Sequence, residues 1–477
     1  ERILRYNRRE SGISAFSAGK ETELRERGGA PLLSACLLNL TEWVRMMREF
    51  SALCQALESG ALDDTLRTLS CLGAEIPSGA RSRVARVAKG FQETFGREEH
   101  TPVAVLSAPG RTEIGGNHTD HQRGRVLAAA VNLDFLACAA PNGTQAIRFQ
   151  SEGWPMVEVD LNTLEPQEGE RETTASLVRG MAARIAQLGY APAGFDAYAI
   201  SDVLPGSGLS SSAACEVLLG NIFNTLFCKN ELSPVTIAQM GQYAENQFFG
   251  KPSGLMDQMA SSVGGAVAID FSDPDAPVIE PLAVDLEQQG YALCIVDSGA
   301  DHADLTAEYA AIPEEMKAVA AFFGRSVLRE VPEEDFWRAF SEVRKAAGDR
   351  AVLRAMHFYA DDRRVDREAK ALAAGEFDAF LTLVKESGRS SWTHLQNIAP
   401  AGAVKEQAMA VALAAAERAL DGTGAFRVHG GGFAGTIQAF VPLDRLDAFR
   451  MQMEEILGAG CCHILSIRPV GGAVIWQ

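Results

Sequence analysis

Three residues of this chain carry the side chains that a phosphoryl transfer requires. Glu245 and Asp257 lie in the stretch Ala244-Glu-Asn-Gln-Phe-Phe-Gly-Lys-Pro-Ser-Gly-Leu-Met-Asp-Gln258, and Arg111 lies far upstream. Such a transfer needs a magnesium ligand and a group that orients the attacking hydroxyl or accepts its proton. Arg111 would neutralise charge on the transferred group and keep Asp257 ionised. For any single carboxylate, however, a solvated helix face is the commoner setting, so the surrounding sequence has to decide.

A glycine-rich loop supplies the second half of that chemistry. It reads Leu204-Pro-Gly-Ser-Gly-Leu-Ser-Ser-Ser-Ala-Ala214. Glycines let the backbone turn tightly and approach a ligand closely, and the three serines offer hydroxyls and amides where a helix begins, which suits a phosphate chain. The alternative is an ordinary strand-to-helix turn with a serine cap. The loop matches neither a Walker A motif nor a dinucleotide-binding fingerprint.

Hydrophobic periodicity places these residues among alternating strands and helices. The predicted strands cover residues 103–107, 126–138, 145–150, 195–200, 293–297, 426–428, 436–441 and 464–469, with a long polar loop at 108–121. The predicted helices are two or three within 47–97 (the last at 80–95), then 171–188, 211–226, 234–249, 303–323, a long helical region through 334–420, and 443–457. Alternation in both halves predicts an α+β protein.

The first 45 residues differ from the rest because they lack methionine and show no sustained period. The helical pattern begins only after Met46 and Met47, so we expect the native start at one of these methionines and an upstream or poorly folded extension before it. The predicted organisation is an extension at 1–45, a helical segment at 46–100, and two lobes at 101–288 and 289–477.

Composition excludes several function classes. The net charge of −18 argues against nucleic acid or an anionic membrane as the main partner. Nine cysteines form no paired framework, which favours a reducing, cytoplasmic setting. The most apolar run, 126–140, is interrupted by Asn132 and Asp134, so no membrane span is expected.

Three separated motifs resemble those of the GHMP small-molecule kinases and, among them, of galactokinases. The galactokinase signature is approximately APGRVNLIGEHTDYNGG, and this chain reads Ala108-Pro-Gly-Arg-Thr-Glu-Ile-Gly-Gly-Asn-His-Thr-Asp-His-Gln-Arg-Gly124. The family's GLSSSA stands intact from Gly208 to Ala213, and its MDQ motif is Met256-Asp257-Gln258. Besides the signature and the GLSSSA segment, Val428-His-Gly-Gly-Gly-Phe-Ala-Gly435 resembles the third motif of the GHMP kinases. The resemblance extends from about residue 100 to the end of the sequence.

This resemblance implies a two-lobed GHMP kinase fold and a role for each matching residue. The N-terminal lobe would be ribosomal-protein-S5-like, the C-terminal lobe ferredoxin-like, and a helical extension would precede them. Asp257 would be the catalytic aspartate at the sugar's anomeric hydroxyl, and Arg111 its partner. The implied ATP-binding residues are Gly206, Ser207, Gly208, Leu209, Ser210, Ser211 and Ser212, with Ser212 and Glu245 as magnesium ligands. The implied sugar-binding residues are Asn117, His118, Thr119, Asp120, Gly254 and Tyr309.

The implied activity is a galactokinase that takes ATP as co-substrate and Mg²⁺ as cofactor. Its partners would be a small sugar and ATP, with the protein a monomer or a weak homo-oligomer. Asn117 stands where the family has glutamate, which is expected to accept a hydrogen bond from a sugar hydroxyl away from the reacting carbon, and His121 replaces a tyrosine. Asparagine is neutral and would tolerate a sugar carboxylate better than glutamate would.

Galactose is therefore the first expected substrate, and a uronic acid or a deoxy or pentose analogue is the alternative. A sugar- and ATP-binding sensor without kinase activity is a further alternative, although Asp257, Arg111, Ser212 and Glu245 are needed together only for turnover. A mevalonate- or homoserine-type kinase is disfavoured by the His118-Thr-Asp120 segment.

Overall fold

The computed structural model of the chain describes residues 43, 46–71, 77–203, 208–251, 253–300 and 305–477. The chain separates into two units, Glu1–Met46 and Met47–Gln477, and the helices and strands named below belong to the second. The predicted extension at 1–45, apart from residue 43, lies outside the described residues, as do Gly206 and Ser207 of the glycine-serine loop.

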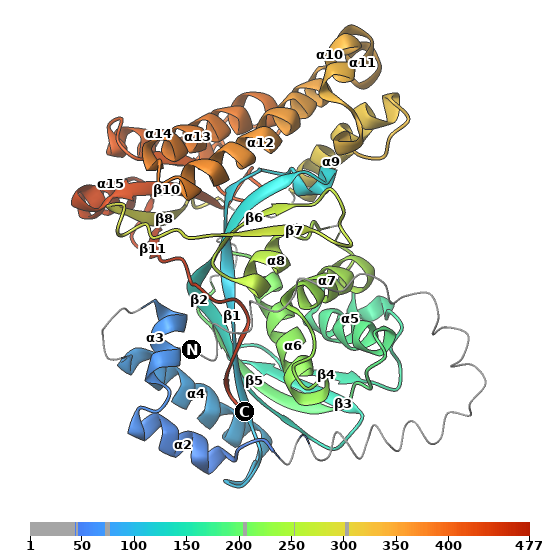
Figure 1. Cartoon of the computed structure of the whole chain (residues 1–477), viewed down its shortest axis with the longest axis vertical. Coiled ribbons are helices and arrows are strands. Elements are labelled where there is room, and N and C mark those ends of the chain that lie inside the picture. The colour runs from blue at the N-terminus through green and yellow to red at the C-terminus, as the bar shows by residue number, and fades with distance from the viewer. Residues whose placement is uncertain (1–42, 44–45, 72–76, 204–207, 252, 301–304) are drawn as a thin grey trace. The chain divides into compact units, whose positions relative to one another are not determined.

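Helices and strands alternate along the second unit (Figure 1). The strands are β1 (Ala104–Gly115), β2 (Arg125–Pro141), β3 (Ala146–Ser151), β4 (Val157–Asp160), β5 (Phe195–Ser201), β6 (Ala266–Asp270), β7 (Val278–Leu282), β8 (Tyr291–Asp297), β9 (Ala425–Val428), β10 (Thr436–Pro442), β11 (Cys462–Leu465) and β12 (Ala473–Trp476). The α-helices are α2 (Phe50–Ser59), α3 (Asp63–Ser70), α4 (Ser78–Phe95), α5 (Thr174–Gln187), α6 (Ser211–Phe227), α7 (Pro234–Ala244), α8 (Met256–Val263), α9 (Thr306–Phe322), α10 (Glu333–Arg338), α11 (Phe340–Ala347), α12 (Asp349–Ala373), α13 (Phe377–Ser390), α14 (Ala408–Leu420) and α15 (Leu446–Leu457).

The described strands form two sheets. The larger has the order β12-β1-β2-β5-β3-β4, and β6 pairs with the other end of β2 and with β7. Only β3 and β5 run parallel in it; the other pairs are antiparallel. The smaller sheet has the order β11-β8-β10-β9 and is wholly antiparallel. Because β12 pairs with β1, the last strand returns to the sheet in which the first strand lies.

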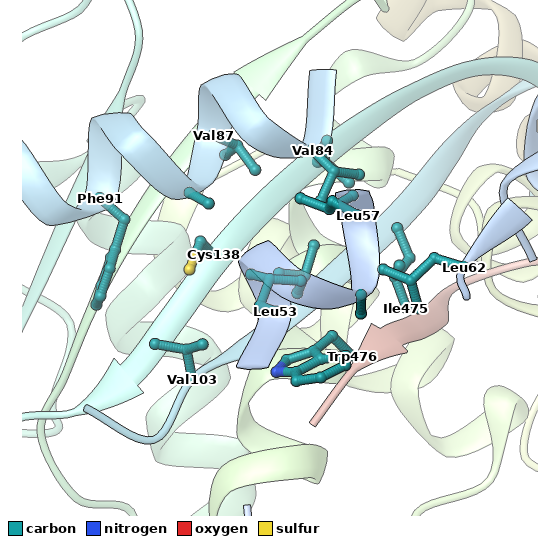
Figure 2. Close-up of a cluster of buried hydrophobic side chains, with 14 of the residues drawn as sticks. Leu53, Leu57, Leu62, Val84, Val87, Phe91, Val103, Cys138, Ile475 and Trp476 are labelled. Atoms are coloured by element: carbon teal, nitrogen blue, oxygen red, sulfur yellow. The ribbon is translucent and has the colours of Figure 1, made fainter. Parts of the chain in front are cut away.

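Helices α2, α3 and α4 cover one end of the larger sheet. Their apolar positions recur at helical spacing, and Leu53, Val87 and Phe91 are fully buried. They pack against Cys138 of β2 and Trp476 of β12, as Figure 2 shows. The helical N-terminal segment is therefore part of the core of the second unit. Helices α6 and α8 pack against β1 and β2 as well.

The smaller sheet is packed against α14 and α15. Its apolar core includes Val296 of β8, Ile437 of β10, Leu413 of α14 and Met453 of α15. The long helix α12 contacts α9 and α13, and it also reaches β1 and β2 of the larger sheet. Two helix-covered sheets confirm the predicted α+β class and are consistent with the two-lobed fold. The lobe boundary at 288/289 stays a prediction.

Several strands differ from those predicted from the sequence. β1 does not end at Ser107: it continues through Pro109 to Gly115, where a polar loop was predicted. Its ladder to β2 shifts register beside Pro109, which has no amide to donate and is tolerated at such irregularities. Strands β4, β6, β7 and β12 were not predicted, and β11 ends at Leu465 rather than near residue 469.

The helices of the described segments include none that combines the length and the apolar character needed to cross a lipid bilayer.

Candidate active site

Arg111 and Asp257 form an ion pair at the centre of the site. Arg111 lies on β1 and is 5% exposed; its Nε donates to Asp257 Oδ1 at 2.7 Å. Asp257 stands in the first turn of α8, and Met259 and Ala260 of that helix pack into an apolar cluster with β2 and β6. Packing of α8 therefore holds the carboxylate against the arginine.

Asp257 remains ionised in this setting. Burial alone would raise the pKa of its carboxyl, but Arg111 and a hydrogen bond from the Ser210 hydroxyl outweigh burial and bring the pKa below its ordinary value. A carboxylate with a low pKa is ready to accept a hydrogen bond from a substrate hydroxyl. Arg111 also donates to the backbone carbonyl of Gly208, so the pair is tied to the glycine-serine loop.

The described part of that loop, residues 208–212, leads into α6. Gly208 has a φ of 70°, and a side chain there would come within 2.8 Å of His429 and Thr436. Ser210 also has a positive φ, at 54°, in the position just before the helix. The Leu209 carbonyl accepts from the Arg111 amide at 3.0 Å, which fixes the loop on β1. A free helix N-terminus at a strained, glycine-containing turn suits a phosphate group.

Ser212 and Glu245 lie together beside the start of α6. The Ser212 hydroxyl is 3.4 Å from Glu245 Oε1, which also accepts from Lys251 Nζ at 2.9 Å. Gln258 donates to the other oxygen of Glu245 at 2.9 Å. Among the described residues, no three His, Cys, Asp or Glu side chains gather as a metal cluster. A hydroxyl and one carboxylate nevertheless suit Mg²⁺, which commonly takes its other ligands from phosphate and water.

A cavity of about 610 Å³ opens beside the ion pair. The predicted site residues in its wall are Arg111, His118, Asp120, Ser210, Gly254, Asp257 and Tyr309. These residues come from β1, the turn after it, the glycine-serine loop, the segment before α8, the first turn of α8, and α9. The cavity therefore brings together residues that are nearly 200 positions apart in the sequence.

The neutral side chains of the cavity are held by carbonyls of the Gly430–Gly432 turn. His118 adopts a φ of 61°, and its Nε2 bonds the Gly431 carbonyl at 3.0 Å. Burial and the neighbouring His121 lower the pKa of His118 to about 3, so the ring is neutral and this nitrogen carries the donated proton. Burial raises the pKa of Tyr309 to about 12, and its hydroxyl donates to the Gly432 carbonyl at 2.9 Å.

Asn117 and Thr119 are the predicted sugar-binding residues that the structure does not bring to the cavity. Both are fully buried and neither belongs to the cavity wall. The Thr119 hydroxyl bonds the backbone carbonyls of Gly116 and Arg125. The Asn117 side chain is satisfied entirely by protein groups. Within this structure the two residues shape the turn that presents His118 and Asp120.

Glu113 is the pocket residue that sequence reasoning missed. It lies in the cavity wall and bonds Arg427 Nη2 at 2.6 Å. Burial raises its pKa to about 7, although Arg427 and Arg111 oppose the rise. The signal was available: side chains two apart on a strand share a face, so Glu113 follows Arg111 into the site once β1 is extended. Lys251 and Glu172 also line the cavity and were not predicted.

Two family models match the chain. The model described as GHMP kinases N terminal domain matches residues 176–265, and the model described as Galactokinase galactose-binding signature matches residues 89–141. The second match contains Arg111 and the turn with His118 and Asp120, while the first contains the described loop residues and Asp257.

Curated galactokinases are similar over most of the chain. A galactokinase of Glaesserella parasuis serovar 5 (strain SH0165) is 31% identical over 374 residues, which cover 76% of this chain and 91% of that protein. A galactokinase of Streptomyces coelicolor is 30% identical over 376 residues, covering 78% and 92%.

Among solved structures, a Lactococcus lactis galactokinase complexed with galactose superposes with a TM-score of 0.71 at 25% identity, covering 82% of this chain and 99% of that one. A Methanococcus jannaschii mevalonate kinase, at 14% identity and a TM-score of 0.52, shares the fold, with 76% of this chain and 98% of that one covered.

Proposed function

The chain belongs to the galactokinase family of the GHMP kinases, and from this premise we propose that it transfers the γ-phosphate of ATP to the anomeric hydroxyl of galactose, giving galactose 1-phosphate. The observation that carries the proposal is the Arg111–Asp257 pair in the wall of a cavity shared with His118, Asp120 and Tyr309. An ionised carboxylate and a guanidinium side by side in a cavity wall are what a sugar 1-kinase requires.

Each residue of the pair has a distinct proposed role. Asp257 accepts the hydrogen bond of the anomeric hydroxyl, orients its oxygen toward the γ-phosphorus and takes its proton as the new O–P bond forms. Arg111 keeps Asp257 ionised before the reaction and stabilises the negative charge on the transferred group. ADP then leaves with the electrons of the broken bond. His118, Asp120 and Tyr309 hold the rest of the sugar.

The donor side is proposed to be the glycine-serine loop with the start of α6. Backbone amides of residues 208–212 would bind the phosphates of ATP. Ser212 and Glu245 would hold Mg²⁺, which neutralises charge on the phosphates when it is bound. Lys251, paired with Glu245 at 2.9 Å, adds a positive charge on the same side. We also propose that the protein acts in the cytoplasm as a monomer or weak homo-oligomer.

The uronic-acid alternative loses its support. It rested on a neutral Asn117 in the sugar pocket, whereas that residue is buried behind the wall and the carboxylate of Glu113 lies in it. The sensor alternative is not favoured, because the Arg111–Asp257 pair that turnover would need is present.

Galactose-dependent ADP release by the chain and by Asp257→Asn tests the proposal. The wild-type chain should release ADP with Mg²⁺-ATP and galactose, and Asp257→Asn should lower kcat by about 10²–10⁴-fold while ATP binding stays unchanged. Asp447→Asn, at a side chain that is 88% exposed, is the matched control and should keep full activity. An Asp257→Asn variant with wild-type kcat would contradict the assigned role.

A further inference from the structure

The turn segment of this chain exchanges two residue types with respect to the family signature. In APGRVNLIGEHTDYNGG, an asparagine follows the arginine by two positions and a glutamate follows it by six. Here Glu113 follows Arg111 by two positions and Asn117 follows it by six. The segment thus keeps one carboxylate and one carboxamide, but in each other's place.

The structure brings the exchanged residues into contact. Asn117 Nδ2 donates to Glu113 Oε1 at 2.9 Å and to the Gly430 carbonyl at 2.7 Å. Its Oδ1 accepts from Ser391 Oγ at 3.1 Å and from Asn397 Nδ2 at 2.8 Å. All the hydrogen-bonding capacity of this buried amide is used within the protein, so Asn117 has none left for a ligand.

Glu113, by contrast, keeps an oxygen for a ligand. Arg427 Nη2, at 2.6 Å, and Asn117 Nδ2 both bond the same oxygen, Oε1. Among the described residues no donor bonds Oε2 of this side chain, which is 3% exposed and belongs to the cavity wall. A nearly buried carboxylate oxygen without a protein partner is costly unless a ligand or water donates to it.

The position of Glu113 along β1 indicates which part of a sugar it meets. Arg111 and Glu113 point to the same side of the strand and lie about 7 Å apart along it. Arg111 marks the reacting end because it bonds Asp257. Glu113 is therefore offset along β1 from the Arg111–Asp257 pair. A sugar whose anomeric carbon lies at that pair would bring ring hydroxyls remote from this carbon toward Glu113.

We propose that Glu113 is the specificity-determining carboxylate of this sugar pocket, accepting a hydrogen bond from a hydroxyl remote from the anomeric carbon, and that Asn117 positions it. The inference rests on the proposed sugar kinase function and narrows its substrate class to neutral aldohexoses. Burial raises the pKa of Glu113 to about 7, so the side chain is partly ionised near neutral pH, and a sugar carboxylate placed against its ionised form would meet like charge. Galacturonate is therefore disfavoured by Glu113, although position 117 is neutral.

The first test measures Glu113→Gln and the wild-type full chain with galactose and with each singly deoxygenated galactose. Glutamine keeps the shape but removes the charge, so kcat/KM for galactose should fall about tenfold to a hundredfold, mainly through KM. For the one analogue that lacks the contacted hydroxyl, wild type and variant should be alike. Equal losses on every sugar, or no loss at all, would overturn the assignment. Galacturonate should gain in relative turnover in the variant.

The second test exchanges the pair. Glu113→Asn alone removes the carboxylate, and Asn117→Glu alone places two carboxylates within hydrogen-bonding reach, so each should lower kcat/KM about tenfold or more. The double variant restores one carboxylate and one amide, so its kcat/KM should recover to within about threefold of wild type. If the two substitutions acted independently, their losses would multiply and kcat/KM would fall further. A double variant that is folded, by its thermal unfolding midpoint, yet as weak as the product of the singles would refute the coupling.

The proposed kinase function and the proposed role of Glu113 can fail separately. A wild-type chain that releases no ADP with galactose would overturn the proposed function and this inference with it. An active wild type whose Glu113→Gln variant treats every sugar identically to wild type would leave the kinase function standing and overturn only the role of Glu113.

Discussion

At the scale of single residues, Arg111 controls how its neighbouring carboxylate titrates. Burial pushes the pKa of Asp257 upward and Arg111 is the largest influence against it. Without the guanidinium, burial would dominate and the pKa would rise. The wild-type carboxylate, with its lowered pKa, stays ionised at neutral pH, and activity linked to it is lost only as the pH falls through that low value.

We predict that Arg111→Gln shifts the acidic limb of the pH profile of kcat/KM toward higher pH and lowers kcat by roughly 10²–10³-fold at neutral pH, because charge stabilisation is lost as well. A pH series of initial rates measures both effects. Arg344→Gln is the matched control, since Arg344 pairs with the exposed Asp349 far from the site in sequence and should leave the profile unchanged. An unshifted acidic limb in Arg111→Gln would mean that Asp257 does not govern it.

At the scale of elements, the start of α8 and the turn after β1 meet without room for a side chain. A methyl group on Gly254 would overlap the carboxylate of Asp120, which lies in the same cavity wall. Glycine there allows the loop before α8 to approach the turn that carries His118 and Asp120.

Gly254→Ala should therefore displace Asp120 and lower kcat/KM for galactose about tenfold or more, since a hydrogen bond to a charged group is lost. Steady-state kinetics with varied galactose measures the change. Gly79→Ala serves as control because a methyl group there meets nothing within 4 Å, and its kinetics should match wild type. Unchanged kinetics in Gly254→Ala would show that Asp120 is not needed at its present place.

Helix α2 is predicted to be an integral part of the folded unit. Leu53 is fully buried between α4 and the sheet, so Leu53→Ala should lower the free energy of unfolding by about 2–5 kcal/mol. Val411→Ala, at a side chain that is 52% exposed, should change it by less than about 0.5 kcal/mol. Urea unfolding compares the two, and equal stabilities would mean that α2 does not fold with the sheet.

The sequence predicted long periodic elements better than short ones. Helices α4 and α6 lie close to their predicted bounds because each has many apolar positions. Strand β7 was missed because its five residues include Pro281 and none of them is buried, so no alternation marks it. Strand β12 was missed because Gly471 and Gly472 precede it and its partner, β1, lies more than 350 residues away.

The candidate site, too, has residues that the sequence predicts and residues that only the structure reveals. Asp257, Arg111, His118 and Asp120 were predicted because motif spacing singles them out, and the fold brings them to one cavity. The places of Glu113 in the cavity wall and of Asn117 behind it could not be read from residue types alone. The face on which Glu113 lies is set by the continuation of β1 past Pro109. The Asn117 side chain is held in the interior by Ser391, Asn397 and the Gly430 carbonyl.

At the scale of the whole molecule, both sheets contribute to one site. β1 of the larger sheet supplies Arg111 and Glu113, while the turn between β9 and β10 of the smaller sheet supplies the carbonyls that hold His118 and Tyr309. Arg427 of β9 also reaches across to Glu113. The sugar is therefore expected to bind where the two sheets meet, with ATP at the loop before α6.

Identification of the product decides whether this chain forms galactose 1-phosphate. The wild-type chain is incubated with Mg²⁺-ATP and galactose, and the phosphorylated sugar is analysed by phosphorus–proton correlation NMR. We predict equal amounts of ADP and of galactose carrying phosphate on its anomeric oxygen. Phosphate on any other oxygen, or no galactose phosphate while another aldose in a parallel panel is phosphorylated, would contradict the account.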